Sequence, residues 1–236
     1  MMNEDEGGRW PFARPMLAGA TLYDRLFACF GAMAGIALTM VICAQFPLAT
    51  SDLPIIVAPI GASAVLVFAV PASPLAQPWS VVGGNIVSTL VGVTAARMIA
   101  DPFLAGGVAV GGAILAMSLL RCLHPPGGAA ALTAVIGSPA IHAAGYSFAF
   151  APVALNSIAL VSLAMFFHRL SGHSFPHQPG VAAADLGSVR EAAGFHLEDI
   201  DLALADMADS FDISREDLDL LLSRAEMHAL ERRGGR

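Results

Sequence analysis

The feature that most constrains this chain is a long stretch almost without charge. Between Leu26 and His168, the formally charged side chains are only those of Asp52, Arg97, Asp101 and Arg121. Charged residues make up 13% of the sequence and hydrophobic residues 56%, whereas an ordinary soluble domain is about 25% charged. Because roughly 20 apolar helical residues cross a bilayer core, the sequence predicts an all-α, polytopic membrane protein in contact with the lipid bilayer.

A charged segment follows the apolar one. From Asp185 to Arg236 there are 13 acidic residues and 6 arginines, which account for the whole net charge of −7. A nucleic-acid partner requires a basic face, so none is expected. The predicted organisation is an N-terminal cytoplasmic segment, a membrane domain, a linker and an acidic cytoplasmic helical tail, over 1–21, 22–170, 171–196 and 197–236. Two short tail helices, at 197–210 and 215–232, are predicted to form a hairpin.

Six apolar segments are predicted to cross the membrane, at 26–46, 55–70, 80–100, 103–120, 127–142 and 148–168. The second and fifth are short, and both open on proline and glycine. An offset of 67 residues aligns Pro59 with Pro126 and Gly61 with Gly128. One span precedes and one follows each motif, so the chain divides into two units of three spans.

An odd number of spans per unit places the second unit upside down in the membrane. Inverted repeats with interrupted helices are typical of transporters. The sequence therefore predicts two inverted three-helix repeats with short, broken second and fifth helices. Five crossings, with the fifth segment as a re-entrant loop, is the alternative.

Arginine placement predicts the orientation. With the N-terminus inside, Arg97 lies outside and the other arginines of the first 170 residues lie in the cytoplasm, at Arg9, Arg14, Arg25, Arg121 and Arg169. The first residues include Glu4, Asp5 and Glu6 and lack an apolar core with a cleavage site, so no secretory signal peptide is expected. Both termini are then cytoplasmic.

Helix breaks inside a membrane require that the freed backbone groups face a cavity or other protein. One interpretation is that both shortened helices point their N-termini at a shared midplane site, where unpaired amides and the helix dipole bind a small anion. That site would consist of Gly61, Ala62 and Ser63 from one motif and Gly127, Gly128 and Ala129 from the other. The alternative is that these glycines only allow tight helix crossing.

Three further polar residues are candidates for substrate binding. His124 precedes the second break and is a candidate proton carrier, since its charge changes near neutral pH; the alternative is a loop histidine at the interface. Asn85 and Asn156 occupy corresponding places in the two units. A membrane-embedded asparagine bonds either a neighbouring helix or a substrate.

Neither an enzyme activity, a cofactor nor a bound metal is expected. The three cysteines Cys29, Cys43 and Cys122 fall in apolar stretches at unrelated spacings and are interpreted as small buried hydrophobes. His168, His173 and His177 are spaced like metal ligands, but no cysteine or carboxylate joins them. The chain contains no nucleophile elbow, phosphate loop or HExxH motif.

The stretch His124-Pro125-Pro126-Gly127-Gly128-Ala129 resembles the signature of the HPP family of integral membrane proteins. The resemblance extends to 59–64, 73–78 and 83–85, and so covers most of 22–170. It implies a bacterial or chloroplast membrane protein, here assigned to the bacterial inner (plasma) membrane, and links some family members to nitrite transport. Two short sequences in the tail, at 199–204 and 212–218, resemble the segment before the paired CBS domains of longer family members. The sequence does not extend into such a pair, so nucleotide sensing by CBS domains is not implied.

These observations favour a transporter or channel for a small inorganic anion, with nitrite as the first candidate. The alternative is a non-transporting membrane scaffold or sensor that acts through its acidic tail. The expected partners are the lipid bilayer, the small anion substrate and a cytoplasmic protein bound by the 197–236 tail. Small-residue faces on spans one and four also predict a homo-oligomer, either a dimer or a trimer.

Overall fold

A computed structural model describes residues 22–46, 54–172, 174–178, 197–207 and 212–234. In the membrane domain, the helices are α1 Leu22–Cys43, α2 Pro59–Ala69, α3 Pro78–Met98, α4 Pro102–Leu119, α5 Pro125–Ile136, α6 Pro139–Ala144 and α7 Leu155–Ser171. A short 3₁₀ turn, η2 (Pro74–Ala76), precedes α3, and an irregular helical segment, η3 (Ala149–Ala154), precedes α7. The tail contains α9 (Leu197–Met207) and α10 (Arg215–Gly234). The polytopic helical bundle predicted from the sequence is therefore confirmed.

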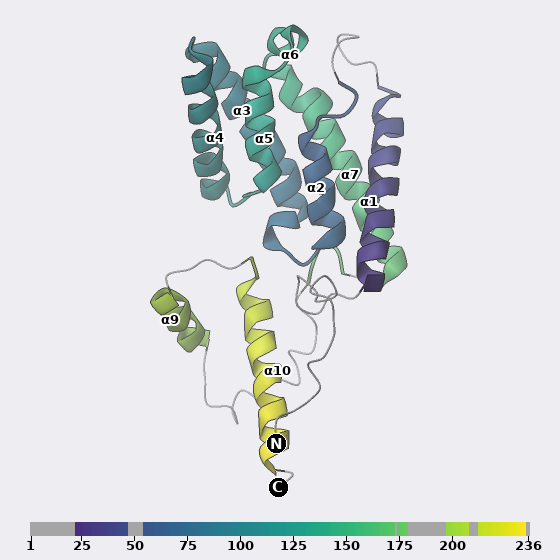
Figure 1. The fold of residues 1–236 in the computed structure, drawn as a ribbon, viewed down its shortest axis with the longest axis vertical. Helices are drawn as coiled ribbons and strands as arrows, with labels where there is room; N and C mark the ends of the chain where they lie inside the picture. The colour runs from purple at the N-terminus through teal and green to yellow at the C-terminus, as the bar shows by residue number, and fades with distance from the viewer. Residues whose placement is uncertain (1–21, 47–53, 173, 179–196, 208–211, 235–236) are drawn as a thin grey trace, which may run out of the picture.

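The path of the chain through the bundle is inverted between its two halves. In Figure 1, α1 runs away from the tail, α2 returns toward it and α3 runs away again, whereas α4, α5 and α7 follow the opposite sequence of directions. Within the described ranges, four helical segments, Leu22–Cys43, Pro78–Met98, Pro102–Leu119 and Ala149–Ser171, are long and apolar enough to cross a membrane. The shorter α2 and α5 are apolar as well, and they are the two broken elements of the predicted repeats.

Proline determines where most of these helices begin. It stands at a first helical position in α2, α3, α4, α5 and α6, where its missing N–H would have no helical partner anyway. The second predicted span, 55–70, is therefore helical only from Pro59. The fifth, predicted over 127–142, ends at Ile136, because Gly137 has an extended backbone (ψ 178°) and Pro139 starts a new helix. The sixth is irregular before Leu155.

The helices pack in two groups, and each group combines two helices of one repeat with the third helix of the other repeat. Helix α3 packs most extensively against α4 and α5, whereas α1 packs against α7 and α2. The third helix of each repeat thus joins the first two helices of the other repeat. One apolar core contains residues of α2 and α7, including Phe68 and Leu160, and a second contains residues of α3, α4 and α5, including Ala109 and Ala131. We call these the α1–α2–α7 group and the α3–α4–α5 group.

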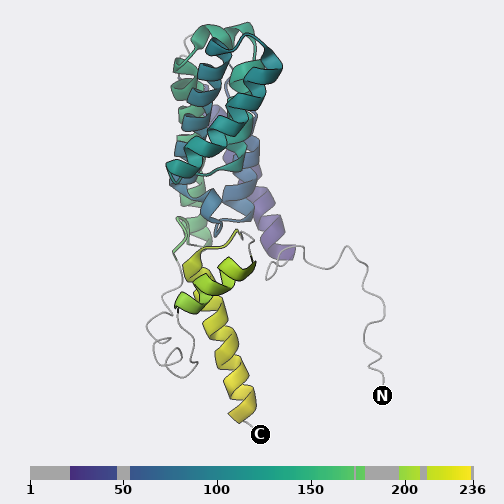
Figure 2. The ribbon, with the colours of Figure 1, turned by 90° about the vertical axis from the view of Figure 1, so that its left-hand side faces the viewer.

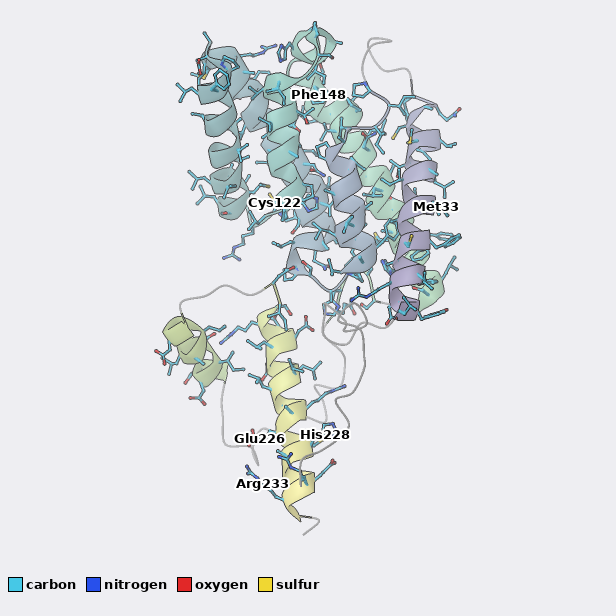
Figure 3. All side chains as sticks on the ribbon, viewed as in Figure 1. Met33, Cys122, Phe148, Glu226, His228 and Arg233 are labelled. Atoms are coloured by element: carbon cyan, nitrogen blue, oxygen red, sulfur yellow. The ribbon has the colours of Figure 1, made fainter. Side chains whose placement is uncertain are left out.

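Glycines bring α3 and α5 into backbone contact within their group. A Cβ placed on Gly92 would lie 2.3 Å from the carbonyl oxygen of Ala131 and 2.8 Å from its Cα. Real Cβ atoms essentially never approach backbone this closely, so the observed helix separation requires glycine at this position. Outward-facing side chains instead meet the bilayer: Met33 points away from the bundle on α1 (Figure 3) and is 64% exposed. Cys29 is exposed on the same helix, unlike the buried Cys43 and Cys122, so it does not have the buried position predicted from its sequence context.

The tail lies at the end of the bundle where α1 begins and α7 ends (Figures 1 and 2). Ser214 caps α10 by accepting from the Asp217 N–H at 3.1 Å, as the capping-box pattern predicts. Helix α9 meets α10 near its start, where Arg215 pairs with Asp201, rather than lying along it as a hairpin (Figure 2). Leu221 of α10 consequently stays 58% exposed.

The loop before α3 makes the contacts that join the bundle to the C-terminal part of the chain. The Ser73 hydroxyl donates to Asp212 Oδ1 at 2.7 Å, and the His177 N–H donates to Gln77 Oε1 at 2.9 Å. The His177 ring in turn lies 2.9 Å from the Asp217 carboxylate. Burial acts to raise the pKa of Asp217, but its hydrogen bonds with Ser214 and His177 and the His177 charge hold that pKa below its usual value.

Candidate functional site

The two breaks meet through side chains at the starts of α2 and α5. Ser63 lies in the second turn of α2, and His124 is the residue immediately before α5. Ser63 Oγ and His124 Nε2 are 2.8 Å apart, and both side chains are completely buried. Figure 3 marks Cys122, two residues before His124, between the ends of α4 and α5 that face the tail. The broken helices are therefore joined at one buried point.

The second ring nitrogen of His124 determines the tautomer. Nδ1 lies 2.8 Å from the carbonyl oxygen of Leu75, which can only accept, so Nδ1 carries a proton. A neutral ring then presents Nε2 as an acceptor for the Ser63 hydroxyl. A protonated ring donates from Nε2 to Ser63 Oγ instead, and the Ser63 hydroxyl donates to the carbonyl of Pro59, 3.2 Å away. The Ser63–His124 bond thus exchanges donor and acceptor when the ring gains or loses a proton.

Asn85 of α3 extends this contact into a network. Its Nδ2 donates to Ser63 Oγ at 3.3 Å and to Ser157 Oγ, on α7, at 3.2 Å. The Ser157 hydroxyl donates to the carbonyl of Val153 at 2.9 Å. We call Ser63, Asn85, His124 and Ser157 the buried polar network; all four are 0% exposed.

Two buried polar atoms at this network have no hydrogen-bond partner among the described residues. They are Asn85 Oδ1 and the hydroxyl of Ser88, one turn further along α3. A buried polar group left unpaired costs about 1–3 kcal/mol, and polar groups at membrane depth usually mark a functional pathway. These two atoms therefore have unused hydrogen-bonding capacity in this arrangement of the described residues.

The network also spans the boundary between the two helix groups. Ser63 and Ser157 belong to the α1–α2–α7 group, whereas Asn85 and His124 lie in α3 and at the start of α5. All three hydrogen bonds among the four residues cross this boundary. A relative movement of the two groups must therefore lengthen or break these hydrogen bonds.

Asn156 has a different set of partners, although it corresponds to Asn85 in the repeat. Its Oδ1 accepts from the Val57 N–H at 3.0 Å, and its Nδ2 donates to the carbonyl of Ile55 at 2.9 Å. These two groups belong to the non-helical segment before α2, which has no helical hydrogen bonds of its own. Asn156 therefore holds the first break in place and is not part of the buried polar network.

The remaining predicted residues are not gathered around the network. Gly61, Ala62 and Ala129 are exposed, and a Cβ on Gly61 would meet nothing within 4 Å. Gly128 is half-buried and its nearest neighbour is Val110. Gly127, in contrast, is buried, and a Cβ there would lie 2.6 Å from Ser88 Oγ. Gly127 thus leaves space for the unpaired hydroxyl.

Several amides at the two helix starts already have partners. The N–H groups of Ile60 and Gly61 donate to Val57 and Ala58, and that of Gly127 donates to His124. The adjacent prolines have no N–H to offer. The polar side chains of the network, rather than opposed free amides, are therefore the groups that this arrangement brings together.

Sequence reasoning missed Ser157 and the carbonyl of Leu75. Ser157 follows Asn156 directly, but the sequence contains no signal for which of two neighbouring polar residues faces the centre. The loop carbonyl has no sequence signature at all. Among the residues with a described position, no group of three metal-ligating side chains occurs; His168 instead bonds the carbonyl of Val67 at 2.8 Å, and His173 lies outside the described residues.

Comparisons with known proteins agree with this architecture. The family described as HPP, transmembrane region, matches residues 18–176. Two transmembrane proteins of Dictyostelium discoideum are 39% identical over 114 residues and 34% identical over 119 residues. These alignments cover 47% and 49% of this chain, but only 36% and 41% of the respective relatives. No solved structure matches the chain.

Proposed function

The chain belongs to the HPP transmembrane-region family, and from this premise we propose that it transports or conducts a small inorganic anion, with nitrite as the first candidate. The observation that carries the proposal is the buried polar network, in which His124 and Asn85 meet Ser63 and Ser157 across the boundary between the two helix groups. Inverted repeats with a polar site at their broken helices are the usual architecture of secondary transporters.

The chemistry of the network supports an anion accompanied by a proton. A bare anion is costly to place in a low-dielectric interior, and an adjacent positive charge offsets that cost. His124 is the group that supplies such a charge when protonated. Its Nδ1 stays bound to the Leu75 carbonyl, so a proton arriving at Nε2 acts on Ser63 and hence on the boundary between the groups.

The unpaired atoms of Asn85 and Ser88 provide further contacts for the transported species. The Ser88 hydroxyl can donate to an anion oxygen, and Asn85 Oδ1 can accept from a water molecule or from the protonated form of the anion. In our proposal, the anion crosses between the α1–α2–α7 and α3–α4–α5 groups as they rock against each other.

The direct test is uptake of nitrite by proteoliposomes that contain the purified protein, with and without an inward proton gradient. We expect nitrite uptake above that of empty vesicles, and we expect the proton gradient to accelerate it. In His124→Ala, the rate of uptake should fall at least about tenfold. Ser118→Ala is the matched control, because Ser118 is exposed on α4 and bonds only its own helix. Thermal unfolding in detergent verifies that each variant is folded.

Two results would count against parts of this proposal. If nitrite, nitrate, formate and chloride all fail to enter faster than into empty vesicles, the protein is not an anion transporter. If His124→Ala transports at the wild-type rate, proton movement through His124 is excluded, whereas transport itself stands.

A further inference from the structure

A cavity opens at the end of the bundle opposite the tail. It has a volume of about 310 Å³ and lies among the last turn of α3, the start of α4, the second half of α5 and α6. Since a water molecule occupies about 30 Å³ in the liquid, this space is large enough for a small oxyanion together with part of its hydration shell. Its walls include Val93, Ala134 and Ile141, which are apolar.

Arg97 supplies the positive charge in this cavity. Its Nη2 lies 2.2 Å from the position that a Cβ on Gly145 would occupy, and Gly145 has a φ of +54°. The guanidinium carbon also lies 4.9 Å from the centre of the Tyr146 ring, a distance suited to a cation–π contact. Arg97 is thus held against the corner after α6, and it has no ion pair with any residue that the structure describes.

His142 supplies a second polar group. Its Nε2 lies 3.0 Å from the carbonyl of Val135, so Nε2 carries the proton that makes this bond. The nearest acid along the chain, Asp101, is directed elsewhere, because its carboxylate accepts from the Leu104 N–H at 2.8 Å and caps α4. Asp101 is not an ion-pair partner of Arg97 in the described part of the chain.

We propose that this cavity is an anion-binding vestibule in which the guanidinium of Arg97 holds a small monovalent oxyanion such as nitrite. Arginine suits this role, because its planar fork of donors matches two oxygens of one anion. The role of the vestibule in transport rests on the proposed function, whereas the binding itself does not.

The backbone contact between Gly92 and Ala131 lies between the vestibule and the buried polar network along α3 and α5. An anion in the vestibule is consequently separated from His124 in this arrangement of the helices. The vestibule thus collects the anion at one membrane face, and transfer to the network requires α3 and α5 to separate at Gly92, within their own helix group.

Binding is measured by isothermal titration of sodium nitrite into the full-length protein in nanodiscs. We expect Arg97→Gln to weaken binding at least about tenfold, as for the loss of a hydrogen bond to a charged group, and Arg97→Lys to weaken it less. Arg169→Gln, which changes an exposed arginine at the end of α7, should bind like the wild type. Thermal unfolding is recorded for every variant. If Arg97→Gln fails to fold, the nitrite affinity of Arg97→Lys relative to the wild type tests the vestibule instead.

Wild-type affinity in both Arg97 variants would overturn the vestibule, as would an absence of nitrite binding to the wild type. A second arm separates this outcome from a failure of the proposed function. In proteoliposomes, Arg97→Gln should raise the KM for nitrite and leave the maximal rate nearly unchanged, whereas His124→Ala should still bind nitrite in nanodiscs. Arg97-dependent binding without any uptake would refute transport and retain the vestibule. Uptake with an unchanged KM in Arg97→Gln would refute the vestibule and retain transport.

Discussion

The contact between α3 and α5 permits a quantitative prediction for Gly92→Ala. The new Cβ would lie 2.3 Å from the Ala131 carbonyl oxygen, whereas ordinary van der Waals contact begins at 3.4 Å, so the two backbones must separate by about 1 Å. Overpacking of this kind costs about 1–3 kcal/mol. The alanine itself favours a helix over glycine by about 1 kcal/mol, and this gain must be removed by a control.

Gly107→Ala is that control. Gly107 also lies within a helix, α4, but its Cβ would meet nothing within 4 Å. The gain in helix propensity therefore applies to both variants, and the overpacking applies only to Gly92→Ala. We expect Gly92→Ala to be less stable than Gly107→Ala by about 1–3 kcal/mol.

The assay is reversible unfolding in mixed micelles with increasing denaturing detergent, followed by circular dichroism. Gly107→Ala should unfold at the same or a higher detergent fraction than the wild type, and Gly92→Ala at a lower one. If the two variants unfold within about 0.5 kcal/mol of each other, a margin comparable to ordinary surface substitutions, the backbone contact at Gly92 does not hold α3 against α5.

Two further predictions concern Asn156 and the tail. Asn156→Ala should lower the free energy of unfolding by about 2–4 kcal/mol, because it leaves the Val57 N–H and the Ile55 carbonyl unpaired; Ser162→Ala, on the exposed side of α7, should change it little in the same unfolding assay. Because the pKa of Asp217 is lower in the folded protein, its contribution to tail docking should be complete above the usual aspartate range and lost as pH falls through the lowered value. Hydrogen exchange at the start of α10, corrected for the intrinsic pH effect, should rise over that range in the wild type and vary less in Asp217→Asn.

Much of the architecture follows from simple sequence signals. Charge depletion located the membrane segments, since charged side chains are excluded from the bilayer core. Proline and glycine located both breaks, because a helix interior tolerates neither well. The inverted path followed from the number of spans in each repeat, which is a matter of counting.

The helix partners could not be predicted in the same way. All six membrane segments are apolar on most faces, so periodicity does not indicate which face meets which neighbour. The hydrophobic pattern therefore could not predict that α3 packs with α4 and α5, or that α7 packs with α1 and α2. For the same reason, Asn85 and Asn156 had equivalent sequence contexts, although one joins the buried polar network and the other holds the first break.

The candidate site was predictable in position but not in composition. Ser63, His124 and Gly127 stood out because they lie at the breaks, and the structure places them at the junction. Gly61, Ala62 and Ala129 were selected by the same reasoning, but a helix start exposes some residues while it buries others. The substrate and the coupling proton are tested by the uptake experiments above, whereas the bacterial inner membrane and the rival scaffold role stay predictions from the sequence.

The link between Asn156 and the first break has a consequence for biogenesis. The Val57 N–H and the Ile55 carbonyl, which lie 99 and 101 residues from Asn156, obtain their partner only from α7. An unsatisfied backbone group in lipid costs several kcal/mol, so we expect the first three spans to reach their final arrangement only after α7 has been made. The two halves consequently mature together after the last span has been inserted, and a chain truncated before α7 should be retained as an unfinished substrate for membrane quality control.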